Sequence, residues 1–131
     1  LKLWRKKMEL VEIIRNSLIV LHFVGLASLL GGFLTQVKAM GAGTAKIVPA
    51  MVHGAWTALA TGLLLVGVAE WRIAMGANFE VDHTKIGLKT LVVALILILV
   101  MINRKKESVT ASVFGLIGAL TLSNVVLAVF L

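Results

Sequence analysis

The sequence contains no cysteine, no tyrosine and a single proline in 131 residues. Without cysteine the protein has no disulfide, no thiolate metal site and no cysteine nucleophile. With one proline, long stretches of chain can continue as helix without interruption. Acidic residues are also scarce, since six Asp and Glu stand against 13 Lys and Arg and leave a net charge of +7. No phosphate-binding glycine loop, HExxH motif or nucleophile elbow is present, so the sequence indicates no enzyme class.

Hydrophobic residues make up 60% of the chain, and the mean hydropathy is +1.03. Soluble domains contain roughly 45–50% apolar residues. A soluble domain of this length would leave much of its apolar surface uncovered, so the excess needs lipid around it. We therefore expect an integral membrane protein. The basic residues lie at the ends of the apolar runs, where membrane lipids with anionic headgroups are the expected partners and nucleic acid is not.

Four apolar runs are long enough to cross a bilayer as helices. At about 1.5 Å per residue, a helix of roughly 20 residues crosses the hydrocarbon core. Residues 16–37, 47–69 and 108–131 carry no charged side chain. Residues 84–103 carry Lys85 and Lys89 near their start, one turn apart, where both can extend to the headgroups. Because the runs are continuous and do not alternate, helices are favoured over a barrel.

Residues 3–15 precede the first run, and apolar side chains recur there at helical spacing: Trp4, Met8, Val11 and Ile14. This pattern predicts an amphipathic helix at the membrane interface. The connections between the runs are short, which forces neighbouring helices to be antiparallel. The predicted fold is all-α, with residues 1–131 forming one transmembrane domain. It is an up-down-up-down four-helix bundle with an interfacial N-terminal helix.

The basic residues also predict an orientation. Five of the 13 lie on the far side of the membrane from the N-terminus, namely Lys38, Lys46, Arg104, Lys105 and Lys106. The remainder lie on the N-terminal side, so we expect a multi-pass cell-membrane protein with a cytoplasmic N-terminus. The chain begins at Leu1 and ends in an apolar run, so its ends need not be native termini. Its first run is too long for a cleaved signal sequence, and three more runs follow it.

Small residues recur at four-residue spacing in two of the runs. The second run contains Ala50, Gly54, Ala58 and Gly62, and the fourth contains Ala111, Gly115, Ala119 and Ser123. The first run adds Gly25, Ala27, Ser28, Gly31 and Gly32. Helices in lipid associate through close backbone contact, which such strips allow, so we predict that these are the packing faces. The alternative is that glycine and alanine are simply common in membrane helices.

Polar residues inside a membrane are costly and are therefore candidate sites. His22 lies in the first run, and His53 lies in the second, followed at four-residue spacing by Thr57 and Thr61. Because successive helices run in opposite directions, we expect the two histidines in opposite leaflets, too far apart to ligate one iron. We expect Asn124 to hydrogen-bond with His22. Gln36 and Asn103 are expected in the leaflet of His53.

The three histidines are candidate cofactor ligands. His83 begins the third run, and a pair formed by His22 and His83 could hold haem as its axial ligands. A proton or quinone role for one histidine is another reading. The simplest reading is a neutral histidine bonded to a neighbouring helix, with no cofactor. Around the loop before His83, the spacing of carboxylates matches no metal-ligand pattern, so no metal site is predicted.

Nearly the whole chain resembles a group of small four-span actinobacterial membrane proteins of uncharacterised function. The resemblance is carried by LIVLHFVGLASLLGGFLTQ around His22, MVHGAWTALATGLLLVGV around His53 and HTKIGLKTLVVALILILVMINRKK from His83. More distantly, the histidines beside small residues resemble four-helix haem proteins of the cytochrome b561 and copper-resistance D types. That resemblance implies haem, with axial histidines at one depth. The opposite-leaflet placement of His22 and His53 departs from this pattern.

Three functions remain open from the sequence. The first expectation is a non-catalytic membrane protein that binds a partner, either a second copy or a larger membrane complex in which it is an accessory subunit. The second is a b-type haem or quinone-associated electron-transfer protein that uses His22 with His83, or His53 alone. The third is a small solute or proton transporter that depends on His53.

Overall fold

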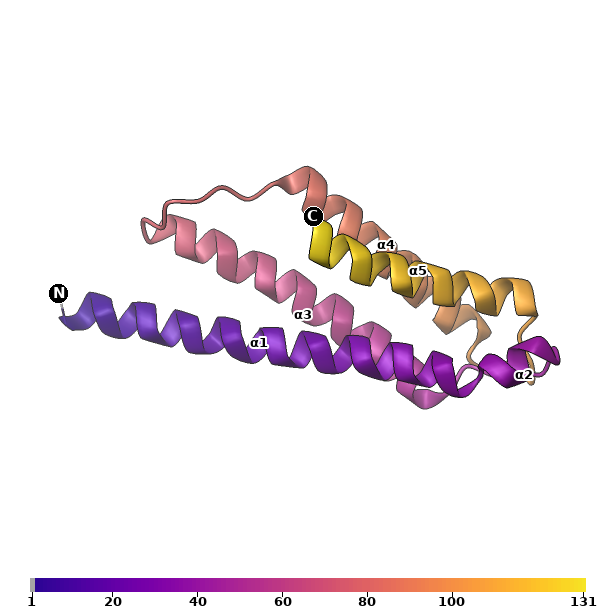
Figure 1. Cartoon of the computed structure of the whole chain (residues 1–131). Coiled ribbons are helices and arrows are strands. Elements are labelled where there is room, and N and C mark those ends of the chain that lie inside the picture. The colour runs from indigo at the N-terminus through magenta and orange to yellow at the C-terminus, as the bar shows by residue number, and fades with distance from the viewer. Residues whose placement is uncertain (1) are drawn as a thin grey trace.

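The computed structural model describes residues 2–131, and every element in them is helical (Figure 1). The helices are α1 (Lys2–Thr35), α2 (Val37–Gly41), α3 (Pro49–Ala74), α4 (His83–Asn103) and α5 (Ala111–Phe130). Among them α1, α3, α4 and α5 are long and apolar enough to cross a membrane. The prediction of an all-α chain with four such helices is therefore confirmed.

Local sequence explains where the helices begin and end. Pro49 is the first residue of α3. Proline suits this position because a backbone N–H in the first helical turn would have no partner within the helix. The Asp82 carboxylate accepts a hydrogen bond of 3.1 Å from the backbone N of Lys85 and caps α4. Thr110 caps α5 in the same way. Beyond the end of α3, Gly76 takes a positive φ of 96°, which a glycine adopts without strain.

The N-terminal segment is continuous with the first apolar run. Residues 3–15 and most of 16–37 form the single helix α1 of 34 residues, about 51 Å long, which ends at Thr35 before the short α2. This is longer than a hydrocarbon core of about 30 Å. Val11 is fully buried, so the segment predicted as interfacial also packs against protein.

Helices α1 and α3 lie side by side and meet backbone to backbone (Figure 1). A Cβ atom placed on Gly54 would lie 2.6 Å from the carbonyl oxygen of Gly25. A Cβ on Gly25 would in turn lie 2.9 Å from the backbone N of Ala58. Nearby, the Ser28 hydroxyl donates a 2.7 Å hydrogen bond to the carbonyl oxygen of Ala50. Glycine is required at this crossing because no larger residue leaves room for the opposite backbone.

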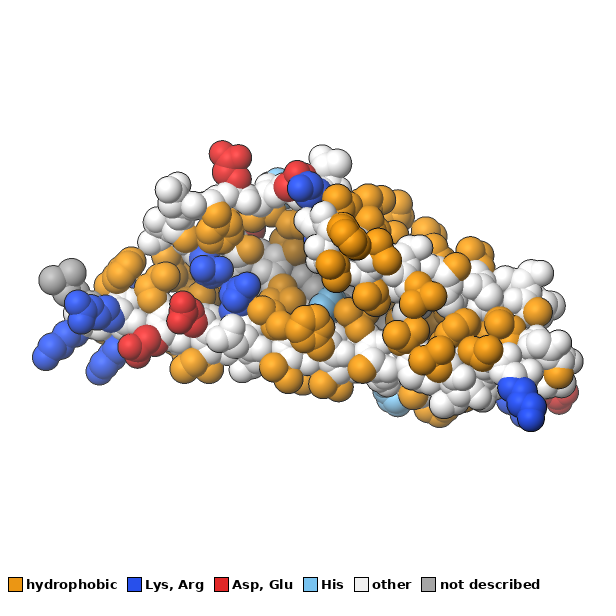
Figure 2. Space-filling view, in the orientation of Figure 1, with side chains coloured by type: hydrophobic (Ala, Val, Ile, Leu, Met, Phe, Trp, Pro, Cys, Tyr) orange, Lys and Arg blue, Asp and Glu red, His pale blue; other side chains and the backbone are white. Residues whose placement is uncertain are grey.

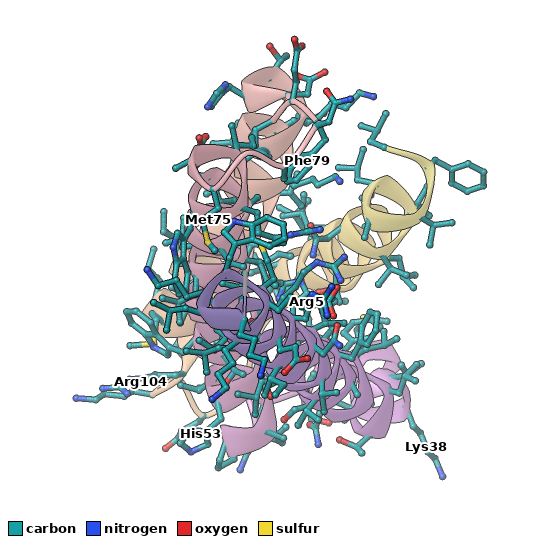
Figure 3. The ribbon with its side chains drawn as sticks, turned by 90° about the vertical axis from the view of Figure 1, so that its left-hand side faces the viewer. Arg5, Lys38, His53, Met75, Phe79 and Arg104 are labelled. Carbon is teal, nitrogen blue, oxygen red and sulfur yellow. The ribbon has the colours of Figure 1, made fainter. Side chains whose placement is uncertain are left out.

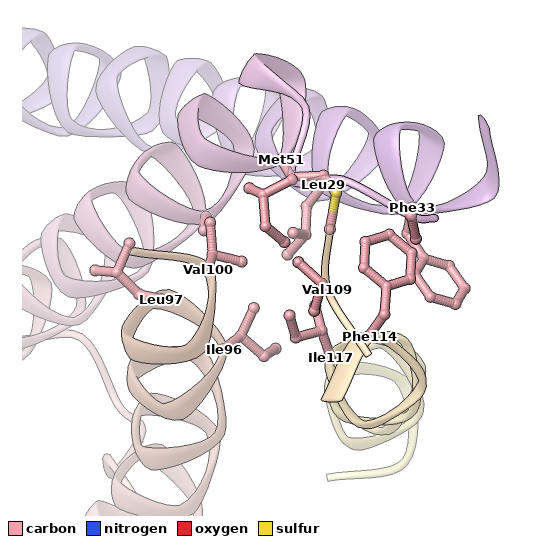
Figure 4. Close-up of a cluster of buried hydrophobic side chains, with 12 residues drawn as sticks. Leu29, Phe33, Met51, Ile96, Leu97, Val100, Val109, Phe114 and Ile117 are labelled. Atoms are coloured by element: carbon pink, nitrogen blue, oxygen red, sulfur yellow. The ribbon is translucent and has the colours of Figure 1, made fainter. Parts of the chain in front are cut away.

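The apolar core lies at the end of the bundle where α1 meets α2 (Figure 4). It contains the stacked pair Phe33 and Phe114, whose ring centroids are 5.2 Å apart. The two connections at this end are joined by a 2.7 Å hydrogen bond from the backbone N of Val109 to the carbonyl oxygen of Ala45. Toward the N-terminus, α4 and α5 diverge from the α1 and α3 pair (Figure 1).

The strip of small residues predicted as the packing face of α5 does not face the core of the bundle. Its members Ala111, Ala119 and Ser123 are exposed. The buried face of α5 instead carries Gly118, and the ring of Phe33 occupies the space beside that glycine. Ala27 and Gly31 of α1 are exposed as well. Four-residue spacing does not show which of two faces with small residues is buried. In α5 the packing of Phe33 against Phe114 and Gly118 determines which face turns inward.

Candidate functional site

A cavity of about 240 Å³ opens near the divergent end of the bundle (Figure 2). It lies between the middle of α3, the N-terminal half of α4 and the C-terminal half of α5, and α1 contributes His22 alone. The walls are mainly apolar: Ala58, Leu59, Gly62, Leu63, Leu65, Val66, Ile86, Val93 and Ala128. The polar side chains in the lining are His22, Lys89, Thr90 and Asn124. An apolar cavity with a few polar groups is the usual form of a small-molecule site.

His22 is held in the cavity wall by Thr61. Its Nδ1 atom lies 2.8 Å from the Thr61 hydroxyl oxygen, which itself lies 2.5 Å from the carbonyl oxygen of Thr57. A carbonyl can only accept, so the single hydroxyl proton of Thr61 goes to Thr57. The hydroxyl therefore accepts from His22, and Nδ1 carries the imidazole proton. Because the other ring nitrogen of a neutral imidazole is then an acceptor, Nε2 presents a lone pair.

Gly62 provides the space for the imidazole ring. A Cβ atom on Gly62 would lie 3.4 Å from Cε1 of His22 and 3.9 Å from its Nδ1. The ring thus lies close to the α3 backbone, between a hydroxyl partner and a residue without a side chain. Within residues 2–131, the side chain that bonds to the ring is Thr61, through Nδ1, and no side chain bonds to Nε2. The wall therefore holds a fixed imidazole with one free acceptor atom.

Asn124, the predicted hydrogen-bond partner of His22, lines the same cavity. It is 4% exposed, and the hydrogen bond of His22 goes to Thr61 and not to Asn124. Lys89 and Thr90, on α4, are partly buried. Sequence reasoning assigned Lys89 only to the lipid headgroups and did not consider Thr90. Lys89 and Thr90 follow Ile86 by three and four residues, so all three share one face of α4, and this spacing is the signal that could have placed them together.

His53 and His83 lie outside the cavity. His53 is exposed in the first turns of α3, on the side of the molecule where Arg104 lies (Figure 3). It lines a separate hollow with Arg104 and Lys105. His83 has a side chain that is 78% exposed, and its Nε2 lies 3.1 Å from a carboxylate oxygen of Glu70. The three candidate ligand histidines are therefore at three different places.

Asn103 and Gln36, two further polar residues of the predicted runs, make hydrogen bonds within the protein. Asn103 donates to the carbonyl oxygen of Leu99 at 2.7 Å, one turn earlier on α4. The Gln36 side chain accepts from the backbone N of Lys46 at 3.0 Å and so joins the two ends of the α1 to α3 connection. Both lie away from the cavity, and their bonds are sufficient to explain them as structural groups.

The cavity does not fit haem. Pockets that enclose drug-sized ligands measure about 300–1,000 Å³, and a porphyrin needs a volume well within that range. The cavity is smaller, and its wall contains one histidine and not an axial pair. Within residues 2–131 there is also no group of three His, Asp or Glu side chains that could hold a metal ion. Comparisons with protein-family models, with curated proteins and with solved structures each found no match to this chain.

Proposed function

We propose that the chain crosses a cell membrane four times, up-down-up-down, with its N-terminus in the cytoplasm. Four helices of suitable length and apolarity support the crossings. The excess of Lys and Arg on the side of the N-terminus supports the orientation. Since α1 is longer than the hydrocarbon core, its first turns lie at the headgroups, where Arg5, Lys6 and Lys7 meet anionic lipids.

Within this frame, we propose that the protein binds a small lipophilic molecule with a polar head in the leaflet that contains His22. One observation carries the proposal: Thr61 holds the His22 imidazole by its Nδ1 in a cavity wall, and no side chain bonds to its Nε2. An acceptor atom in a mainly apolar wall can take a hydrogen bond from the polar head of a ligand. A ligand headgroup supplies the missing partner.

The cavity also limits the size of the ligand. Its volume of about 240 Å³ accommodates a single substituted ring or a short headgroup. The lining consists largely of aliphatic side chains from three helices, which suits an apolar ring body. Lys89 and Asn124 add donors that can meet an oxygen of the same ligand. This arrangement supports binding of such a ligand.

The test is to identify the lipophilic molecules that remain with the purified protein. Organic extracts of wild-type protein and of Ala128→Phe are compared by mass spectrometry. Ala128 is exposed and lines the cavity, so a phenyl group there fills space without disturbing the core. Ala60→Phe is the matched control, because Ala60 is exposed on α3 outside the cavity.

We expect one class of molecule to be enriched in wild-type and Ala60→Phe extracts and lost from Ala128→Phe. Extracts of identical composition from all three proteins would contradict a ligand-binding function. The comparison does not depend on knowing the ligand beforehand.

The outward strip of α5 favours a second function, association with another copy of the chain. Ala111, Ala119 and Ser123 leave a face of small residues exposed, of the kind that allows close helix contact in lipid. Since the chain has no cysteine, Ala119→Cys supplies one reporter thiol. A disulfide-linked dimer from Ala119→Cys but not from Leu95→Cys, an exposed position on α4, supports self-association. Equal crosslinking of both, or of neither, contradicts it.

A further inference from the structure

We infer that the cavity selects ligands that present a hydroxyl group to His22, such as quinols and other phenols, over the corresponding quinones. This inference rests on the proposed ligand-binding function and specifies the class of ligand. It follows from where the protons lie in the chain of hydrogen bonds from His22 through Thr61 to Thr57.

The proton of Thr61 is already committed. Its hydroxyl oxygen lies 2.5 Å from the carbonyl oxygen of Thr57, one turn earlier on the same helix, and that carbonyl has no proton to give. Thr61 can therefore only accept from His22, across a distance of 2.8 Å. The imidazole proton is held on Nδ1, and Nε2 is held as an acceptor.

An acceptor at Nε2 distinguishes the two oxidation states of a quinone. A quinol hydroxyl donates a hydrogen bond to Nε2. A quinone carbonyl oxygen offers only lone pairs, which repel the lone pair of Nε2. For His22 to donate to a carbonyl, its proton would have to move from Nδ1, and Thr61 would have to turn its own proton away from Thr57. That rearrangement loses one hydrogen bond, which corresponds to about a tenfold difference in affinity.

The other polar residues of the cavity do not counteract the preference for a quinol. The ammonium of Lys89 is a donor only, and the Asn124 amide both donates and accepts. An oxygen of a quinol or of a quinone can accept from either residue. Discrimination between the two oxidation states therefore comes from His22.

The experiment compares tetramethyl-1,4-benzoquinol with tetramethyl-1,4-benzoquinone, which have the same carbon skeleton. Binding to the full chain in lipid nanodiscs is measured by equilibrium dialysis without oxygen. We expect the quinol to bind about tenfold more tightly. In Thr61→Val the proton on the ring is no longer held at Nδ1, so the two affinities should become similar. Thr61→Ser keeps the hydroxyl and should keep the preference.

His22→Phe retains a ring but has no ring nitrogen, so the affinity for quinol should fall to that for quinone. If Thr61→Val does not fold, this variant alone tests whether His22 causes the preference. His53→Phe, outside the cavity, should leave both affinities unchanged. Equal binding of the two probes to wild-type protein would overturn the inference and leave the ligand-binding function standing. A preference that survives in His22→Phe would also overturn it. Binding of neither probe would count against the proposed function as well.

Discussion

Gly54→Ala is predicted to push α1 and α3 apart. The added Cβ would lie 2.6 Å from the carbonyl oxygen of Gly25 and closer still to the backbone N of Leu29. Ordinary contacts of carbon atoms begin at about 3.5 Å, so the helices must separate by roughly 1 Å. No side chain can rotate to relieve the contact, because both obstructing atoms belong to the backbone. Overpacking of this kind costs about 1–3 kcal/mol.

Gly67→Ala is the matched control, because Gly67 lies on the same helix and no heavy atom lies within 4 Å of the Cβ it would gain. Replacing glycine by alanine in a helix is itself favourable by up to about 1 kcal/mol, and both variants receive that benefit. We therefore expect Gly67→Ala to be neutral or slightly stabilised. Gly54→Ala should be less stable than Gly67→Ala by about 1–3 kcal/mol, the cost of overpacking alone.

The assay is unfolding in a fixed detergent mixture with increasing SDS, followed by circular dichroism, with free energies taken from the midpoints and slopes. Separation of the helices should also lengthen the hydrogen bond from His22 to Thr61, so ligand binding in Gly54→Ala should weaken. Equal stability of Gly54→Ala and Gly67→Ala would refute the reasoning, because it would mean that α1 and α3 do not meet at Gly54.

Three further predictions concern other parts of the fold. Gly118→Ala should lower the free energy of unfolding by about 1–3 kcal/mol in the same SDS assay, because its Cβ would overlap the ring of Phe33. Combining it with Phe33→Leu should recover part of the loss, and additive losses would argue against contact between the two residues. Asp82→Ala should lower stability by about 1 kcal/mol because α4 loses its cap, while Asp82→Asn should stay near wild type because asparagine also caps helices. Equal losses in the two variants would mean that the charge of Asp82, and not its cap, stabilises the helix. A membrane-impermeant maleimide added to intact cells should label Thr44→Cys and not Asn78→Cys if the N-terminus is cytoplasmic, and the reverse pattern would invert the orientation.

Some local features could be read directly from the residues. Asp82 and Thr110 are typical capping residues, and each lies at the start of a helix that the apolar runs had located to within a few residues. The separation of His22 from His53 also followed from the direction of successive helices. In the structure, His22 meets the middle of α3 and His53 lies in its first turns, and the two residues line different hollows. These features depend on position along the chain, which a sequence records directly.

The sequence by itself determined that the chain has four long apolar helices, because a backbone surrounded by lipid must satisfy its hydrogen bonds within each helix and the apolar runs have the required length. Only the tertiary structure decided how each helix is rotated about its axis. Lipid is as apolar as the core, so hydrophobicity does not distinguish the inward face of α5 from the outward one. The packing of Phe33 against Gly118 distinguishes them. The same rotation brings His22 to Thr61 and Gly62, residues distant in sequence, and creates the cavity on which the proposed function depends.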